Sequence, residues 1–229
     1  MTYRSSTVSD TTLWPPAFDG AIFDFDGTIA ETAYIWEHVD RAFLGARGIP
    51  YSEEYARALA VLGFDRGARY TIERYNLRET EADIVDEWKR LSWAFYRSEV
   101  TLKPGARSYI LSLKRRGVRC ALATSNEPEL VRSMQHVDAA QLFDTCVYGC
   151  EVGVPKDQPD IYLEAARRMG VDPSRCVVFE DIEPGIRAAQ SAGFLTCAVK
   201  ADDNGQDWEA VSSASDLALI TWEGLVPLT

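Results

Sequence analysis

The feature that most constrains the fold is an alternation of short β-rich runs with amphipathic helical segments, which dominates the chain after Gly105. The helical segments keep their apolar residues on one face and end at a glycine, as in ARSYILSLKRRG (106–117) and PDIYLEAARRMG (159–170). Strands that alternate with helices of this size predict an α/β fold with a parallel sheet covered on both faces. The expected strands are AIFDF (21–25), VRCALAT (118–124), TCVYG (145–149), CVVFE (176–180), TCAVK (196–200) and LALIT (217–221).

Residues 31–103 differ because they contain helical patterns and no convincing strand. Thr80-x-x-Asp83 is typical of a capping box, and apolar residues follow it at helical spacing. The sequence therefore predicts a small all-helical domain inserted after the first strand. The tryptophans expected in the apolar interior of this unit are Trp36, Trp88 and Trp93. The predicted parts of the chain are a polar N-terminal extension (1–17), an α/β core (18–30 and 104–229) and a helical cap (31–103).

Composition excludes several classes of partner. The chain has 229 residues, of which 46% are hydrophobic, and a formal net charge of −11. Binding duplex nucleic acid requires clustered Lys and Arg, so nucleic acid is not an expected partner. No apolar run reaches the length of a membrane span, and the N-terminus lacks the apolar centre of a signal peptide. Five scattered cysteines are typical of reduced thiols, so we expect a cytoplasmic protein. A monomer is the default expectation for its oligomeric state.

The first predicted strand ends in two aspartates, Asp24 and Asp26, which the period of a strand places on the same side. Buried carboxylates are costly unless something compensates for their charge. A calcium loop does not fit, because Gly27 directly follows the second aspartate. An Asp-Gly turn is a second interpretation. The third is a metal and phosphate site at the carboxyl end of a strand, where open α/β sheets bind ligands.

The third interpretation requires phosphate donors, a lysine and further metal ligands at other strand ends, and the sequence contains candidates for each. Thr124-Ser125-Asn126 closes the second core strand, and Glu180-Asp181 ends a later one. Lys156 lies in a loop just before a helix. Taken singly, these residues also fit a helix cap, a turn and a solvated lysine. Because they occur together at successive strand ends, we favour a site that binds Mg²⁺ and phosphate.

These motifs resemble those of the haloacid dehalogenase superfamily, in the branch that includes β-phosphoglucomutase and sugar-phosphate phosphatases. The matching segments are FDFDGT (23–28), ALAT (121–124), Lys156 with DQPDIY, and FEDIEPGIRAAQSAGF (179–194), and the likeness covers residues 18 to 200. The resemblance implies a Rossmann-like core with a helical cap inserted after the first motif. It also implies Mg²⁺-dependent hydrolysis of a small phosphorylated metabolite, such as a sugar phosphate, through an aspartyl-phosphate.

The resemblance also implies a role for each matching residue. Asp24 is expected to be the nucleophile and Asp26 the general acid and base, with Thr124 and Lys156 as the other catalytic residues. Mg²⁺ is expected to bind Asp24, the backbone carbonyl of Asp26, Asp181 and the neighbouring Glu180. The residues expected to contact phosphate or substrate are Gly27, Thr28, Ser125, Asn126 and, from the cap, Arg66.

Two alternative functions stay open. A phosphomutase would return the phosphoryl group to a sugar hydroxyl, but Trp36 occupies the position of the mutase's cap-hinge histidine, which favours a phosphatase. A non-catalytic binding module would have lost some of the motifs, whereas all four are present here. The presence of Asp26 favours phosphate-ester chemistry over the cleavage of carbon–halogen bonds.

Overall fold

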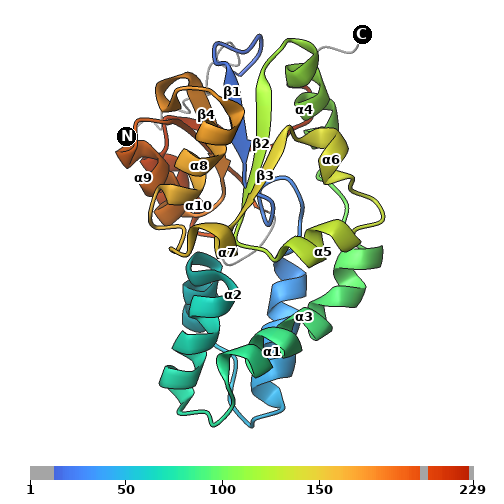
Figure 1. The fold of residues 1–229 in the computed structure, drawn as a ribbon, viewed down its shortest axis with the longest axis vertical. Coiled ribbons are helices and arrows are strands. Elements are labelled where there is room, and N and C mark those ends of the chain that lie inside the picture. Colours follow the sequence, from blue (N-terminus) through green and yellow to red (C-terminus); the bar gives the residue numbers. More distant parts are fainter. Residues whose placement is uncertain (1–12, 202–205, 227–229) are drawn as a thin grey trace, which may run out of the picture.

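Six parallel strands form one sheet in the order β3-β2-β1-β4-β5-β6 (Figure 1). The computed structural model describes residues 13–201 and 206–226. Every predicted strand is present with its ends shifted by no more than two residues, and the predicted fold class is confirmed. The strands are β1 (Gly20–Phe23), β2 (Arg119–Thr124), β3 (Thr145–Tyr148), β4 (Cys176–Glu180), β5 (Leu195–Val199) and β6 (Leu217–Leu219).

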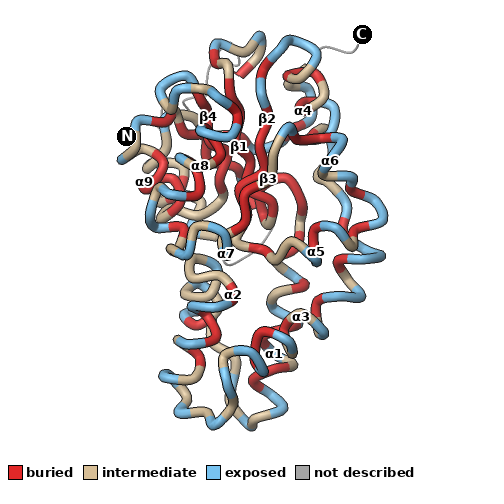
Figure 2. Tube along the Cα trace, in the orientation of Figure 1, coloured by how far each residue is buried: buried red, intermediate tan, exposed pale blue. Residues whose placement is uncertain are grey.

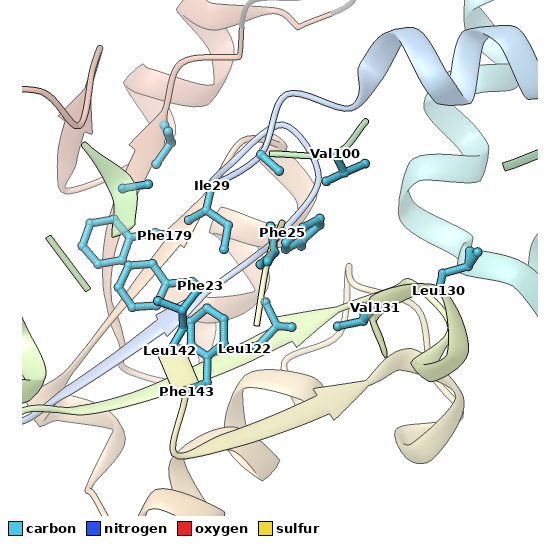
Figure 3. Close-up of a cluster of buried hydrophobic side chains, with 14 of the residues drawn as sticks. Phe23, Phe25, Ile29, Val100, Leu122, Leu130, Val131, Leu142, Phe143 and Phe179 are labelled. Carbon is cyan, nitrogen blue, oxygen red and sulfur yellow. The ribbon is translucent and has the colours of Figure 1, made fainter. Parts of the chain in front are cut away.

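Strand β1 lies in the middle of the sheet, and all of its residues are buried. Ile22 packs on one face with the apolar side of helix α8 (Asp160–Met169). Phe23 points to the opposite face, where its ring stacks on Phe179 of β4 with centroids 4.8 Å apart (Figure 3). Helix α4 (Ala106–Arg115) covers that second face through Tyr109. The period of two along β1 therefore supplies both halves of the core.

The other helices of the core connect the strands or cover the sheet. Figure 2 shows that buried residues are concentrated in the strands and in the loops at their ends. The remaining core elements are α5 (Pro128–Ser133), α6 (Ala139–Leu142), α7 (Gly149–Val152), η1 (Pro173–Arg175), α9 (Glu183–Ser191) and α10 (Trp208–Ala214).

The segment between β1 and α4 forms three long helices at one end of the sheet, next to the loops that follow β1 and β2 (Figure 1). They are α1 (Ala33–Gly45), α2 (Glu53–Tyr75) and α3 (Glu81–Ser98); we call them the cap helices. The predicted capping box at the start of α3 is confirmed, because Asp83 N donates to Thr80 Oγ1 at 3.2 Å and Thr80 N donates back to Asp83 Oδ2 at 2.9 Å. The α2 helix is interrupted at Gly63, whose φ is 69°.

The interruption in α2 lies against the core. A Cβ built on Gly63 would lie 3.5 Å from Ser125, and the backbone N–H of Lys156 donates to the carbonyl of Val61 at 3.1 Å. The cap helices therefore sit directly over the strand ends that carry the sequence motifs.

Most of the expected N-terminal extension, residues 1–12, lies outside the described residues. Leu13 and Trp14 pack on the core, and the carbonyl of Leu13 accepts a hydrogen bond from the Tyr109 hydroxyl at 3.1 Å. None of the helices in residues 13–201 and 206–226 is long and apolar enough to cross a membrane.

Candidate active site

Asp24 lies directly beyond the end of β1. Its backbone N–H donates to the carbonyl of Phe179 at 3.0 Å, so the chain stays tied to β4 after regular pairing ends. The Asp24 side chain is buried, and loss of water around it raises its pKa. Lys156 opposes this effect, and the charges of Glu180 and Asp26 add to it, so that the pKa of Asp24 is about 7.

Lys156 supplies the positive charge that faces Asp24. Its buried ammonium donates to Asp24 Oδ1 and, at 2.6 Å, to Glu180 Oε1. Burial disfavours the charged ammonium, but the two carboxylates outweigh burial and raise the pKa of Lys156. Lys156 therefore stays positively charged beside Asp24.

Glu180, the last residue of β4, is fully buried with both of its oxygens engaged. Its Oε1 accepts from Lys156 and from the Tyr162 hydroxyl at 2.8 Å. Its Oε2 accepts from the backbone N–H groups of Asp181 at 3.0 Å and Ile182 at 3.3 Å. Since a carboxylate oxygen has two lone pairs, these four hydrogen bonds use the full capacity of Glu180. Its position suits it to orient Lys156 more than to bind a metal ion.

One carboxylate oxygen from each of Asp24, Glu180 and Asp181 lies within 4.8 Å of the other two. Loss of water, followed by the charges of Asp24 and Glu180, raises the pKa of Asp181 well above its usual value. Thr28 Oγ1 donates to Asp181 Oδ1 at 3.2 Å and orients it. Three crowded carboxylates fit a hard divalent cation with oxygen ligands, such as Mg²⁺. Because Glu180 is committed to Lys156, the side chains best placed to hold the cation are those of Asp24 and Asp181.

Gly27 makes the close approach of Asp181 possible. Its φ is +77°, and a Cβ at this position would lie 2.1 Å from Asp181 Oδ2. We expect Gly27→Ala to displace the Asp181 carboxylate and to weaken Mg²⁺ binding about 10- to 100-fold, measured by calorimetry. Gly117→Ala is the matched control, because Gly117 has a φ of +82° and no atom within 4 Å of the added Cβ. Equal affinities for Mg²⁺ in the two variants would contradict this role of Gly27.

Asp26 is held by four donors, two of which come from the cap helices. Its Oδ1 accepts from Thr32 Oγ1 at 2.6 Å, from the Trp36 indole N–H at 3.2 Å and from the Tyr96 hydroxyl. Its Oδ2 accepts from Asn126 Nδ2 at 3.3 Å. The orientation of Asp26 therefore depends on the position of α1 and α3 over the core.

The end of β2 lies beside this loop, because Phe23 of β1 pairs with Leu122 of β2 two residues before Thr124. Thr124 is fully buried, and its Oγ1 accepts from the backbone N–H of Asn126 at 3.1 Å. Ser125 and Asn126 line the cavity described below, whereas Thr124 lies behind them.

A cavity of about 620 Å³ lies between the strand ends and the cap helices. Its core side brings together most of the residues that the sequence motifs predicted. These are Asp24, Asp26, Gly27, Ser125, Asn126, Lys156, Glu180 and Asp181. Segments more than 150 residues apart in the chain therefore meet at one edge of the sheet.

Arg66, the cap arginine predicted to contact substrate, does not line this cavity. Its guanidinium donates to the carbonyl of Gly153 at 2.7 Å and links α2 to the core. The arginines that line the cavity are Arg41 and Arg57, on α1 and α2, which sequence reasoning did not single out.

Trp36 and Tyr96 are functional candidates that sequence reasoning missed. Trp36 was expected in the apolar interior of the cap, but its indole N–H also reaches Asp26. The sequence signal that could have revealed this contact is the position of Trp36 in the first helical turn after the loop that carries Asp24 and Asp26. Tyr96 is 70 residues from Asp26 in the chain, so no local pattern could reveal the contact. The burial expected of Trp93 is wrong, because its side chain is 41% exposed, whereas Trp88 is buried as expected.

The fold and the site define a class of α/β enzymes that handle anionic substrates at the carboxyl edge of a parallel sheet. A family model described as haloacid dehalogenase-like hydrolase matches residues 18–193. The chain belongs to this family, which confirms the resemblance found from the motifs.

Among curated relatives, protein CbbY of Cereibacter sphaeroides is 33% identical over 197 residues, which cover 79% of this chain and 83% of the relative. The phosphorylated carbohydrates phosphatase of Thermotoga maritima is 29% identical over 181 residues, which cover 77% of this chain and 82% of the relative. Among solved structures, CbbY from Rhodobacter sphaeroides in complex with phosphate superposes with a TM-score of 0.76 at 29% identity, covering 91% of this chain and 96% of that one.

Proposed function

We propose that this protein is a Mg²⁺-dependent phosphatase that hydrolyses a small phosphorylated metabolite, such as a sugar phosphate, through an aspartyl-phosphate. Membership of the hydrolase family and relatives named as phosphatases support a phosphoric monoester hydrolase. The observation that carries the proposal is the pairing of Asp24 with buried Lys156 at the floor of a cavity, with Asp26 held beside them.

In the first step, a carboxylate oxygen of Asp24 attacks phosphorus and forms an aspartyl-phosphate, which is an acyl phosphate. The bond between phosphorus and the leaving oxygen breaks, and Asp26 donates a proton to that oxygen. Lys156 lies beside the attacking oxygen, so its charge offsets the repulsion between a carboxylate and a phosphate dianion.

In the second step, Asp26 removes a proton from a water molecule that attacks the same phosphorus atom. The bond between Asp24 and phosphorus breaks, which releases inorganic phosphate and restores the carboxylate. Mg²⁺ held by Asp24, Asp181 and the carbonyl of Asp26 would offset negative charge on the phosphoryl oxygens when bound.

The phosphoryl oxygens also need hydrogen-bond donors from the protein. The hydroxyl of Ser125 and the N–H groups of Ser125 and Asn126 are candidates, because both residues follow β2 and line the cavity. Thr124, which was predicted to bind the phosphoryl group, is fully buried and does not line the cavity. Gly27 is a candidate on the other side, where it lines the cavity. Thr28, which was predicted with it, is fully buried, and its hydroxyl donates to Asp181.

The proposal is tested by measuring phosphate release from a broad panel of phosphorylated metabolites, with Mg²⁺ and with excess chelator. We expect turnover of at least one small phosphate ester with Mg²⁺ and loss of that turnover on chelation. A complete absence of turnover across the panel would favour the non-catalytic binding module instead.

A phosphomutase is the second candidate, because a relative named β-phosphoglucomutase, from Bacillus subtilis, is 28% identical over 192 residues. Conversion of β-glucose 1-phosphate in the presence of a bisphosphate primer, faster than phosphate release, would identify a mutase. We expect phosphate release to dominate, because Trp36 occupies the position where the resemblance places the mutase's histidine.

Replacing Tyr96 with Phe tests the positioning of Asp26. Tyr96→Phe removes the cap hydroxyl that donates to Asp26 and that accepts from Trp36 Nε1 at 3.2 Å. We expect kcat to fall roughly 10-fold with little change in KM, because a misoriented acid affects the chemical step more than binding. Tyr75→Phe, at the far end of α2, is the control. Equal kcat values for Tyr96→Phe and wild type would contradict the role of Tyr96.

The monomeric state and the cytoplasmic location stay predictions. Light scattering of the purified protein would measure its mass in solution and test the first of them.

A further inference from the structure

Asp40 is a buried carboxylate that lines the cap side of the cavity. Its side chain is on α1, one helical turn beyond Trp36, on the face that both residues present to the cavity. Only 4% of Asp40 is exposed, and it forms no hydrogen bond or ion pair with any residue in the described ranges 13–201 and 206–226. Loss of water raises the pKa of Asp40 to about 7.

None of the described polar groups near Asp40 in the cap donates to it. Tyr51 also lines the cavity but forms no hydrogen bond with any described residue, and two other groups have other partners. The Tyr55 hydroxyl bonds to Thr71 Oγ1 at 2.9 Å. The guanidinium of Arg41, next in the chain, pairs with Glu37 at 2.7 Å. A buried carboxylate is unfavourable without a donor, and such groups in clefts are frequent at functional sites. The missing donor therefore points to a bound molecule.

The cap side of the cavity, which we call the cap wall, carries more acidic than basic side chains. Its carboxylates outnumber its guanidinium groups, and each arginine has a glutamate four residues before it, at 2.7 Å for Arg41 and 3.8 Å for Arg57. A second phosphate bound here would meet more negative charge than positive. The charged residues of this wall are Glu31, Glu37, Asp40, Arg41, Glu53 and Arg57.

From these observations we infer that Asp40 binds the leaving group of the substrate by accepting a hydrogen bond from a hydroxyl or ammonium group. The substrate class is then a monophosphate ester with such a donor, and not a bisphosphate. The distance from the catalytic residues to Asp40 fits this role. Trp36 contacts Asp26, and Asp40 lies roughly 6 Å further along α1, which is the length of a small metabolite. This inference rests on the proposed phosphatase function.

The test compares wild type, Asp40→Asn and the control Asp86→Asn, which changes an exposed aspartate of α3, on four esters with Mg²⁺. The esters are p-nitrophenyl phosphate, which has no donor in its leaving group, a hexitol 6-phosphate, O-phosphoethanolamine and a hexose bisphosphate. We expect Asp40→Asn to lower kcat/KM about 10- to 100-fold for the donor-bearing monophosphate that wild type prefers, mainly through KM. Turnover of p-nitrophenyl phosphate should change less than threefold.

The two donor-bearing esters separate a hydroxyl from an ammonium as the group that Asp40 recognises. Three outcomes would overturn the inference: a wild-type preference for the bisphosphate, an equal loss on all four esters, or no loss on any. Failure of the phosphatase function itself looks different, because wild type would then not hydrolyse p-nitrophenyl phosphate. Thermal unfolding of each variant checks that it is folded.

Discussion

Replacing Asp24 with Asn should reduce Mg²⁺-dependent phosphate release roughly 10⁴-fold or more, because an amide cannot attack phosphorus as a carboxylate does. The substitution keeps the size of the side chain and leaves Lys156 in contact with Glu180 at 2.6 Å. It also removes a negative charge from a buried group. We therefore expect the variant to fold. We also expect it to retain Mg²⁺ binding, because the amide keeps an oxygen in the position of the carboxylate.

Phosphate release is measured on the best ester of the panel, with calorimetry for Mg²⁺ and circular dichroism for folding. Asp86→Asn again serves as the matched control, since it makes the same chemical change on the exposed face of α3. Wild-type rates in Asp24→Asn would rule out Asp24 as the nucleophile. If the variant does not fold, mass spectrometry of the wild type tests the same role. Trapping the intermediate during turnover should then add one phosphoryl group to Asp24.

Replacing Lys156 with Met should lower the free energy of unfolding by roughly 3–5 kcal/mol and also abolish turnover. The ammonium lies between two buried carboxylates, Asp24 and Glu180. Without it, no other ammonium or guanidinium group in residues 13–201 and 206–226 forms an ion pair with either carboxylate. Urea unfolding at pH 8 without Mg²⁺ measures the effect, and Lys200→Met, at an exposed position, is the control.

A double variant separates loss of the charge pair from loss of packing. We expect Asp24→Asn combined with Lys156→Met to recover part of the stability lost in Lys156→Met alone, because one of the stranded charges is gone. If the free energy lost in the double variant equals the sum of the losses in the two single variants, Lys156 contributes through its hydrocarbon chain and not through its charge.

The strands and the fold class could be predicted because the signals are local. Runs such as CVVFE and RCALAT are apolar except at their ends, as expected of strands buried on both faces, and the structure has them as β4 and β2. At the end of β1 the predicted strand extended too far, because burial continues beyond the last paired residue, Phe23. Phe25 illustrates this, because it is fully buried but lies in the loop after β1.

The cap was less predictable than the core. Helical spacing identified the apolar stripe on α1, but spacing alone cannot distinguish a face that packs on other helices from a face that lines a cavity. Trp36 and Asp40 lie on such a face, and only the packing of α1 over the strand ends shows it. Arg66 is the opposite case. The sequence predicted that it contacts substrate, but its guanidinium donates to the Gly153 carbonyl.

By itself, the sequence determined which residues can carry charge, bind a cation or end a strand, because these properties belong to residue types and their local spacing. It therefore predicted the parallel sheet and the group of Asp24, Asp26, Lys156 and Asp181. Tertiary structure alone decided which buried charges have partners, because a partner can come from anywhere in the chain. It pairs Glu180 with Lys156 and Tyr96 with Asp26, and it leaves Asp40 facing the cavity with no donor among the described residues.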